Sequence, residues 1–125
     1  MANEVDISID QGTSFQQNWI VYAEPTATVL ANLSNFTGSM EVRYNYDSPL
    51  VVFAANTGNN MMINVASSTV TVNISNTDFN NVNYPVNQDA SSIELVYDVY
   101  ITSPTLQSYR IAQGTLTVNR AVTHF

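Results

Sequence analysis

The chain is made of short segments in which hydrophobic and polar residues alternate. The clearest one runs from Ile93 to Thr102, where every second residue up to Ile101 is hydrophobic and Glu94 and Asp98 lie between. A period of two is typical of a strand with one buried face. Segments of this kind recur along the chain, and none has a convincing helical period. The predicted strands are 5–9, 15–23, 40–46, 50–55, 61–66, 69–74, 93–102 and 109–118, with 27–36 left ambiguous.

The last of these segments changes its inward side partway along. Tyr109 and Ile111 set one parity, and Leu116 and Val118 lie on the other. One extra residue must therefore be accommodated between them, as a β-bulge does. Gly114 is the residue between them that tolerates a bulge best, so the pattern predicts the bulge there.

The alternation also predicts which side chains form the core. The expected core residues are Val5, Ile7, Ile9, Phe15, Trp19, Val21, Met40, Val42, Tyr44, Val70, Val72, Ile74, Leu95, Tyr97, Val99 and Ile101.

Many short strands at close spacing favour a sandwich or barrel over other fold classes. At 125 residues, with 45% hydrophobic residues, we expect a single domain, residues 1–125, that buries its own core. We predict an all-β fold: a two-sheet antiparallel immunoglobulin-like sandwich of seven to eight strands.

The surface chemistry is unusual for a globular domain. Charged residues make up only 10%, against about 25% on average. There is no lysine, and 16 Asn, 12 Ser and 13 Thr supply the polar surface instead. Such a surface is compatible with extensive protein contact, since it lacks the long ammonium side chains whose ordering costs entropy. A biased composition of viral or secreted genes explains the same surface.

Net charge and residue content argue against several function classes. A net charge of −7 with three arginines does not suit nucleic-acid binding, which requires cations to displace phosphate counterions. No hydrophobic run has the length of a membrane span, and the N-terminus lacks the basic and apolar regions of a signal peptide. We therefore expect that the protein acts without being exported by a signal of its own and that it has no membrane partner. The absence of cysteine excludes disulfides and thiolate sites.

Catalytic and metal sites find little support in the pattern. The one histidine, His124, is the penultimate residue, where chain ends fray, and a catalytic imidazole must be held rigidly. Asp6 and Asp10 share a strand face about 13 Å apart, too far for a glycosidase pair. Asp78 and Asp89 lie in a long Asn-rich loop, where ordinary turns explain them better than calcium does. We expect no enzyme, no cofactor and no bound metal.

Three pieces of the chain, in order, resemble the small immunoglobulin-like β-sandwich virion proteins of tailed bacteriophages. They are residues 6–15 (DISIDQGTSF), 33–51 (LSNFTGSMEVRYNYDSPLV) and 97–123 (YDVYITSPTLQSYRIAQGTLTVNRAVT). This family occurs at tail, baseplate and fibre attachments and as capsid decoration. The resemblance implies a virion location and other virion proteins as partners, in a homo-oligomer or symmetric array, and it carries no catalytic residues over. The chain departs from the family in having no lysine.

We therefore predict a structural virion protein that joins tail or fibre components through its loops and termini. Capsid decoration and a carbohydrate- or receptor-binding module remain as alternatives. Arg43 and Arg110 lie on outward positions, where a cross-strand ion pair or an interface explains them equally well. The residues expected to contact partners are Arg43, Asp78, Tyr84, Asp89, Tyr100, Arg110, Arg120, His124 and Phe125.

Overall fold

The structure is a computed structural model that describes residues 3–22, 31–79 and 91–120. Within these ranges the chain forms strands and connecting loops and contains no helix. The all-β prediction is therefore confirmed. The strands are β1 (Asn3–Glu4), β2 (Ile7–Asp10), β3 (Phe15–Ile20), β4 (Thr37–Arg43), β5 (Val51–Thr57), β6 (Asn60–Asn64), β7 (Thr69–Ile74), β8 (Ser92–Thr102) and β9 (Ser108–Asn119).

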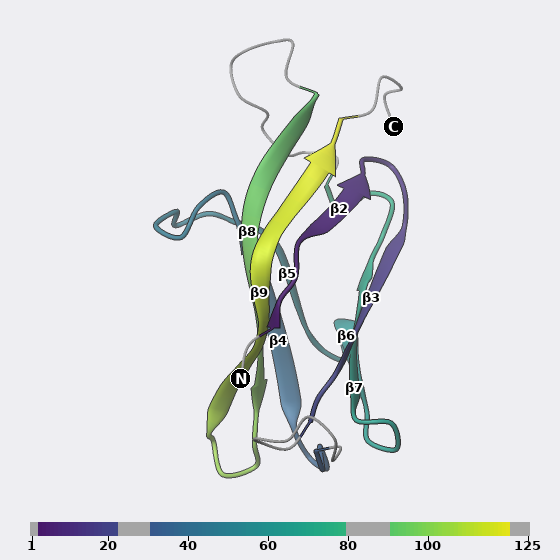
Figure 1. The fold of residues 1–125 in the computed structure, drawn as a ribbon, viewed down its shortest axis with the longest axis vertical. Helices are drawn as coiled ribbons and strands as arrows, with labels where there is room; N and C mark the ends of the chain where they lie inside the picture. The colour runs from purple at the N-terminus through teal and green to yellow at the C-terminus, as the bar shows by residue number, and fades with distance from the viewer. Residues whose placement is uncertain (1–2, 23–30, 80–90, 121–125) are drawn as a thin grey trace.

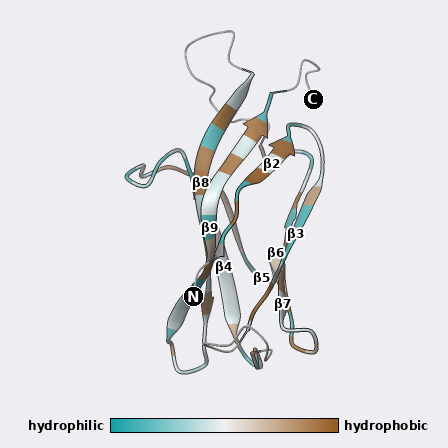
Figure 2. Cartoon of the chain, in the orientation of Figure 1, coloured by the Kyte–Doolittle hydropathy of each residue, from teal (hydrophilic) through white to brown (hydrophobic). Residues whose placement is uncertain are grey.

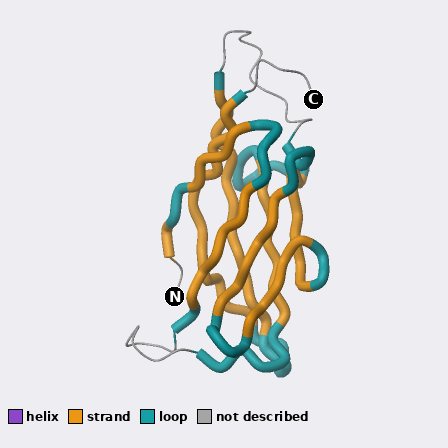
Figure 3. Tube along the Cα trace, turned by 90° about the vertical axis from the view of Figure 1, so that its right-hand side faces the viewer, coloured by secondary structure: helices purple, strands orange, loops and turns teal. Residues whose placement is uncertain are grey.

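Hydrogen bonding joins these strands into one mixed sheet that is nearly barrel-shaped (Figures 1 and 3). The order is β1-β9-β8-β4-β5-β6-β7-β3, and β2 also pairs with β9. β1 and β2 run parallel to β9, β5 pairs parallel to β6, and the other pairs are antiparallel. The expected division into two sheets is not confirmed. The sheet is continuous because pairing persists across the turn at Gly58, where Asn56 pairs with Asn60 and Thr57 pairs with Met61.

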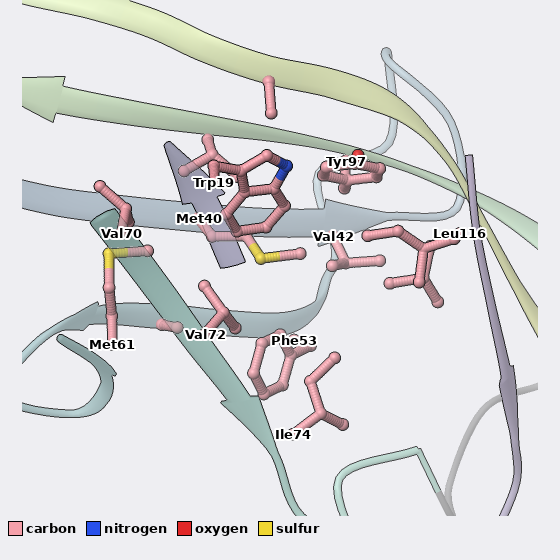
Figure 4. Close-up of a cluster of buried hydrophobic side chains, with 14 of the residues drawn as sticks. Trp19, Met40, Val42, Phe53, Met61, Val70, Val72, Ile74, Tyr97 and Leu116 are labelled. Atoms are coloured by element: carbon pink, nitrogen blue, oxygen red, sulfur yellow. The ribbon is translucent and has the colours of Figure 1, made fainter. Parts of the chain in front are cut away.

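The alternating strands enclose a single hydrophobic core. Of the predicted core residues, twelve are buried, and Val5, Phe15, Val21 and Tyr44 are partly buried and pack against them. Figure 4 shows that the buried side chains come from strands at both ends of the sheet order. Trp19 on β3 and Tyr97 on β8 lie with ring centroids 6.4 Å apart. The sheet therefore folds onto itself, and burial drives this closure.

Two core residues come from segments without strand periodicity. Leu33 precedes β4, and Phe79 follows β7, yet each is at most 3% exposed. Phe79 packs on Phe53 of β5 with ring centroids 5.5 Å apart, and its carbonyl oxygen accepts a 3.2 Å hydrogen bond from Gln11 Nε2. Loops at the ends of the sheet thus complete the core. Figure 2 shows hydrophobic and hydrophilic residues in alternating bands along β8 and β9, whereas Leu33 and Phe79 lie outside the strands.

The bulge in β9 exists, but the predicted position was wrong. Val99 pairs with Ala112 and Tyr100 with Arg110, so the extra residue is Ile111. Ile111 and Ala112 are consecutive and both buried, so the inward-facing positions change from odd-numbered to even-numbered residues at this point. Gly114 lies within regular pairing and serves a different purpose, described below.

Candidate functional site

The hairpin of β8 and β9 contains the two longest strands of the molecule's described part, and its tip carries an unusual turn. The last strand pair is Thr102 with Ser108. In the turn, Ser103 N donates to Gln107 O at 2.8 Å, and Leu106 N donates to Ser103 O at 2.9 Å. The Ser103 hydroxyl also accepts from Gln107 N at 3.1 Å. Pro104 favours this turn because its ring fixes φ near the required value.

Leu106, at the tip, has a backbone φ of 66° and is 84% exposed. A left-handed residue is needed in such short hairpin loops, and glycine or asparagine normally supplies it. For leucine this conformation costs about 1–2 kcal/mol. Nothing in the described fold buries the side chain in return. Backbone strain of this kind concentrates at functional positions, so Leu106 is a candidate site residue.

Aromatic and guanidinium groups flank the tip. The Arg110 guanidinium carbon lies 6.0 Å from the centroid of the Tyr100 ring, in cation–π geometry. Tyr109 is 46% exposed, although its parity predicted an inward position, and its hydroxyl donates to Gln107 Oε1 at 2.9 Å. Tyrosine and arginine are the residues that most often dominate binding energy in protein interfaces. We refer to Tyr100, Leu106, Tyr109 and Arg110 together as the hairpin-tip surface; it covers both faces of the hairpin, because Tyr100 and Arg110 lie opposite each other on the outward face and Tyr109 lies opposite the inward Ile101.

A charged cluster lies beside this surface, on the outward side of β4 and β8. Glu41 is directly opposite Asp98 in the register. Burial raises the pKa of the Asp98 carboxyl, and Glu41 raises that pKa further, while Arg110 and Arg43 act in the opposite direction. Two acids facing each other repel unless cations compensate. The two arginines supply this compensation and so allow the acids to be neighbours.

Arg43 is held within its own strand and the following loop. Its Nη2 lies 2.7 Å from Glu41 Oε1, and its Nη1 donates to Ser48 O at 2.8 Å. The sequence allowed a cross-strand ion pair, whereas the ion pair formed joins residues two apart on β4. With side chains 31% and 50% exposed, such a pair contributes under about 1 kcal/mol to folding. Arg43 therefore braces the loop after β4.

Asp78 is engaged in the turn that follows β7. Its Oδ2 accepts from Ser75 N at 2.7 Å, and its own N donates to Ser75 O at 3.2 Å. This is the ordinary turn role of aspartate. The described residues hold no group of three or more His, Asp or Glu side chains able to bind a metal ion. Asp89, the expected companion of Asp78, lies outside the described residues.

The acids of the N-terminal segment bind β9. Asp6 Oδ1 accepts from Thr115 N at 3.2 Å and from Thr115 Oγ1 at 3.0 Å. Asp10 Oδ1 accepts from Asn119 Nδ2 at 3.0 Å. Both carboxylates therefore fasten β2 to its neighbour.

The remaining candidates are distributed as follows. Arg120 is exposed just after β9, where its backbone N donates to Ser91 O at 2.7 Å. Tyr84, Asp89, His124 and Phe125 lie outside the described residues, so their predicted contacts stay predictions. Of the candidates, the structure brings together Tyr100 and Arg110, with Arg43 nearby in the charged cluster.

Sequence reasoning missed Leu106 and Tyr109. A signal for Leu106 was present in the loop Ser103 to Ser108, which contains neither glycine nor asparagine. Since such a turn needs a left-handed residue, some other residue had to adopt that conformation. The exposure of Tyr109 had no such signal, because its parity matches that of buried residues.

No family model matches this chain, and no curated protein matches it either. In the described residues, no helix has the length and hydrophobicity needed to cross a membrane.

Proposed function

We propose that this protein is a non-enzymatic structural component of a tailed-bacteriophage virion that joins tail or fibre components. The single observation that carries a joining role is Leu106, an 84% exposed leucine held in a left-handed conformation at a hairpin tip. A side chain kept in that state gains stabilisation when a partner buries it. The virion location rests on the resemblance of three sequence pieces to phage sandwich proteins.

The sandwich itself is part of the proposal. β5 and β6 are linked by only two residue pairs, as few as join β1 to β9 at the end of the sheet, so the interior of the sheet has one weak junction. On one side of that junction lie β1, β2, β9, β8, β4 and β5, and on the other lie β6, β7 and β3 (Figure 1). Trp19 and Tyr97 meet between the two groups. This arrangement supports an immunoglobulin-like reading with two layers packed face to face.

In this function the rigid strands position surfaces, and the hairpin tip makes the contact. Leu106 enters an apolar pocket of a neighbouring virion protein, while Tyr100, Tyr109 and Arg110 pack around its entrance. Exposed aromatic and guanidinium groups suit this arrangement because they give large contact areas at modest entropic cost. Many identical copies in a symmetric particle would each use the same contact.

The experiment that tests this function is quantitative mass spectrometry of purified particles of the phage that encodes the chain. We expect a few copies for every hundred copies of the major capsid protein, as a tail or fibre position implies. A ratio near one, or a simple lattice fraction, would replace the joining role by capsid decoration. Absence from the particles would overturn the virion proposal and leave a carbohydrate- or receptor-binding module as the better explanation.

A further inference from the structure

One edge of the sheet is unpaired in the described part of the molecule. β3 is the last strand of the sheet order, and it pairs only with β7 (Figure 1), in a regular register from Phe15 with Ile74 to Ile20 with Thr69. β2 precedes β3 in the chain but pairs with β9 instead. The side of β3 away from β7 therefore presents a row of main-chain donors and acceptors, which we call the β3 edge.

The register identifies which groups face outward from this edge. Val21 N donates to Ser68 O at 2.8 Å, which continues the β3–β7 register by one more residue pair. In antiparallel strands, hydrogen-bonded pairs alternate with non-bonded ones, so odd-numbered residues of β3 bond to β7. The N–H and C=O groups of Gln16, Asn18 and Ile20 then point away from β7. Consistent with this, the carbonyl oxygen of Asn18 accepts a 3.3 Å hydrogen bond from the side-chain amide of Gln17.

The opposite edge of the sheet is protected, and the β3 edge is not. On the opposite edge, β1 and β2 are two and four residues long and are separated by Val5 and Asp6. This edge is charged, since Glu4 lies on β1, Asp10 on β2 and Asp6 between them. Short length, interruption and charge are the devices by which proteins prevent unwanted strand pairing. β3 has six regularly paired residues and contains no charge, no proline and no bulge. The contrast indicates that pairing at the β3 edge is tolerated.

β3 and the next three strands inward in the sheet order, β7, β6 and β5, also carry no charged residue. Residues 11–23 and 48–77 contain no Asp, Glu, Lys or Arg, although the chain carries a net charge of −7. These ranges include all of β3, β5, β6 and β7. The outward side chains on β3 and β7 are instead joined by amide and hydroxyl hydrogen bonds, from Gln16 to Asn73 at 2.9 Å and from Thr71 to Asn18 at 2.7 Å. A second copy can approach here without repulsion between like charges.

We propose that two copies of this chain pair through their β3 edges, antiparallel across a two-fold axis centred on Asn18. In this register Asn18 lies opposite Asn18 of the second copy, and Gln16 lies opposite Ile20. All six outward main-chain groups of each β3 are then paired, whereas a register centred on Gln17 would pair only those of Gln16 and Asn18. The sheet thus continues from one molecule into the next, which is strand addition with a second copy as the occupant.

A second copy fits this edge better than a charged partner strand. Carboxamides donate and accept hydrogen bonds at once, so Asn18 can pair with its own symmetry mate. An isologous contact requires such self-complementarity. The inference goes beyond the proposed virion function, because it holds or fails in the purified protein alone.

Sedimentation velocity of the purified full chain, from about 1 μM to about 1 mM, tests the pairing over the range of weak to moderate affinities. We expect reversible dimers in the wild-type protein. Asn18→Lys and Asn18→Asp each place two like charges opposite each other at the axis, and each variant should be monomeric. An equimolar mixture of the two should form heterodimers, because residue 18 then faces an opposite charge. Asn73→Lys, on the same face but one strand away from the edge, is the matched control and should still dimerise.

The proposal would be overturned by a wild-type chain that is monomeric at the highest concentration, by dimers that persist in Asn18→Lys, or by monomers that persist in the charge-complementary mixture. Loss of dimers in Asn73→Lys to the same extent as in Asn18→Lys would also overturn it, since the axis would not then be at Asn18. Trp19, the single tryptophan, reports by its fluorescence whether each variant is folded. Failure of this test leaves the particle stoichiometry experiment unaffected.

Discussion

Tyr97 lies directly opposite Gly114 in the β8–β9 pair, and its hydroxyl donates to the carbonyl oxygen of Val5 at 2.5 Å. Gly114 has a φ of 154° and is buried, and a Cβ at this position would collide with that same carbonyl. The missing side chain therefore lets the N-terminal segment approach β9 closely. One glycine and one tyrosine together hold β8, β9 and the segment between β1 and β2.

This contact occurs where the parallel pairing to β9 is interrupted. Glu4 pairs with Gln113 and Ile7 with Leu116, so the register is the same on both sides of Val5 and Asp6. In the gap, the Asp6 carboxylate accepts the Thr115 N–H. Side chains of Tyr97 and Asp6 thus satisfy main-chain groups that a regular ladder would have paired.

Gly114→Ala is expected to destabilise the fold strongly. The new methyl group meets the Val5 carbonyl, and the backbone conformation is one that alanine rarely adopts, so we expect a loss of about 3 kcal/mol in the free energy of unfolding. Urea denaturation followed by Trp19 fluorescence measures it. Gly58→Ala is the matched control: Gly58 also has a positive φ, of 88°, but nothing lies within 4 Å of the added Cβ. Its expected cost is only about 1 kcal/mol, and an equal cost in both variants would contradict the Val5 collision.

Tyr97→Phe is expected to change the response of stability to alkali. Burial, and secondarily Asp6, raise the pKa of the Tyr97 phenol to about 12 from its usual 10.0. The folded state holds this proton more tightly than the unfolded state does. The resulting stabilisation is fully present below pH 10 and is lost as the pH rises through about 12.

In unfolding experiments below pH 10, the phenylalanine variant should be less stable by about 1–2 kcal/mol, since the partly buried Val5 carbonyl loses its donor. Above pH 10 the difference from wild type should shrink. A difference that stays constant up to pH 12 would contradict the assignment. Tyr46→Phe, at a position 70% exposed, should leave stability within about 0.5 kcal/mol.

Asp98→Asn is expected to stabilise the protein near neutral pH. Because the pKa of Asp98 is raised in the folded state, the wild-type protein loses stability as the pH rises from the range of an ordinary aspartate through the folded-state pKa. Asparagine has no proton to lose. The variant and the wild type should therefore differ least in acid and most near pH 7, as measured by urea denaturation at several pH values.

Glu94→Gln provides the control for that comparison. It removes one negative charge from the same strand, at an exposed position. If both variants gain stability alike, relief of the overall net charge would explain the gain, and the facing pair of Glu41 and Asp98 would have no special role.

Leu106→Gly is expected to stabilise the free protein and to weaken its incorporation into particles. Glycine adopts the φ of 66° without strain, so thermal unfolding should show a gain of up to about 1 kcal/mol. Removal of the exposed side chain should lower the number of copies in particles assembled with the variant. Thr105→Gly, at the neighbouring loop position, should lower stability because it adds flexibility to the unfolded chain without relieving strain. Unchanged incorporation of Leu106→Gly would remove Leu106 from the contact.

Strand positions and most inward side chains were predictable from the sequence because alternation is a local property of extended backbone. From Ile93 to Ile101 each residue's side follows from that of its neighbour, whatever the strand pairs with. The same locality explains the grouping of Tyr100 and Arg110, which a single hairpin brings together. The presence of a bulge was also predictable, since Ile111 and Leu116 have opposite parity.

The location of the β9 bulge and the role of Gly114 depend on contacts between distant segments, which no local pattern encodes. The residue that lies closest to Gly114 is Val5, which precedes it by more than one hundred residues. The burial of Leu33 and Phe79 likewise requires the closed sheet. Which edge stays unpaired follows from the choice of β2 to join β9 rather than β3. Local alternation is thus sufficient to locate the strands and their buried faces, whereas the pairing partners of the strands and the free β3 edge follow from the folded arrangement. Backbone alternation acts between neighbours, but pairing and closure depend on the free energy of the whole packed core.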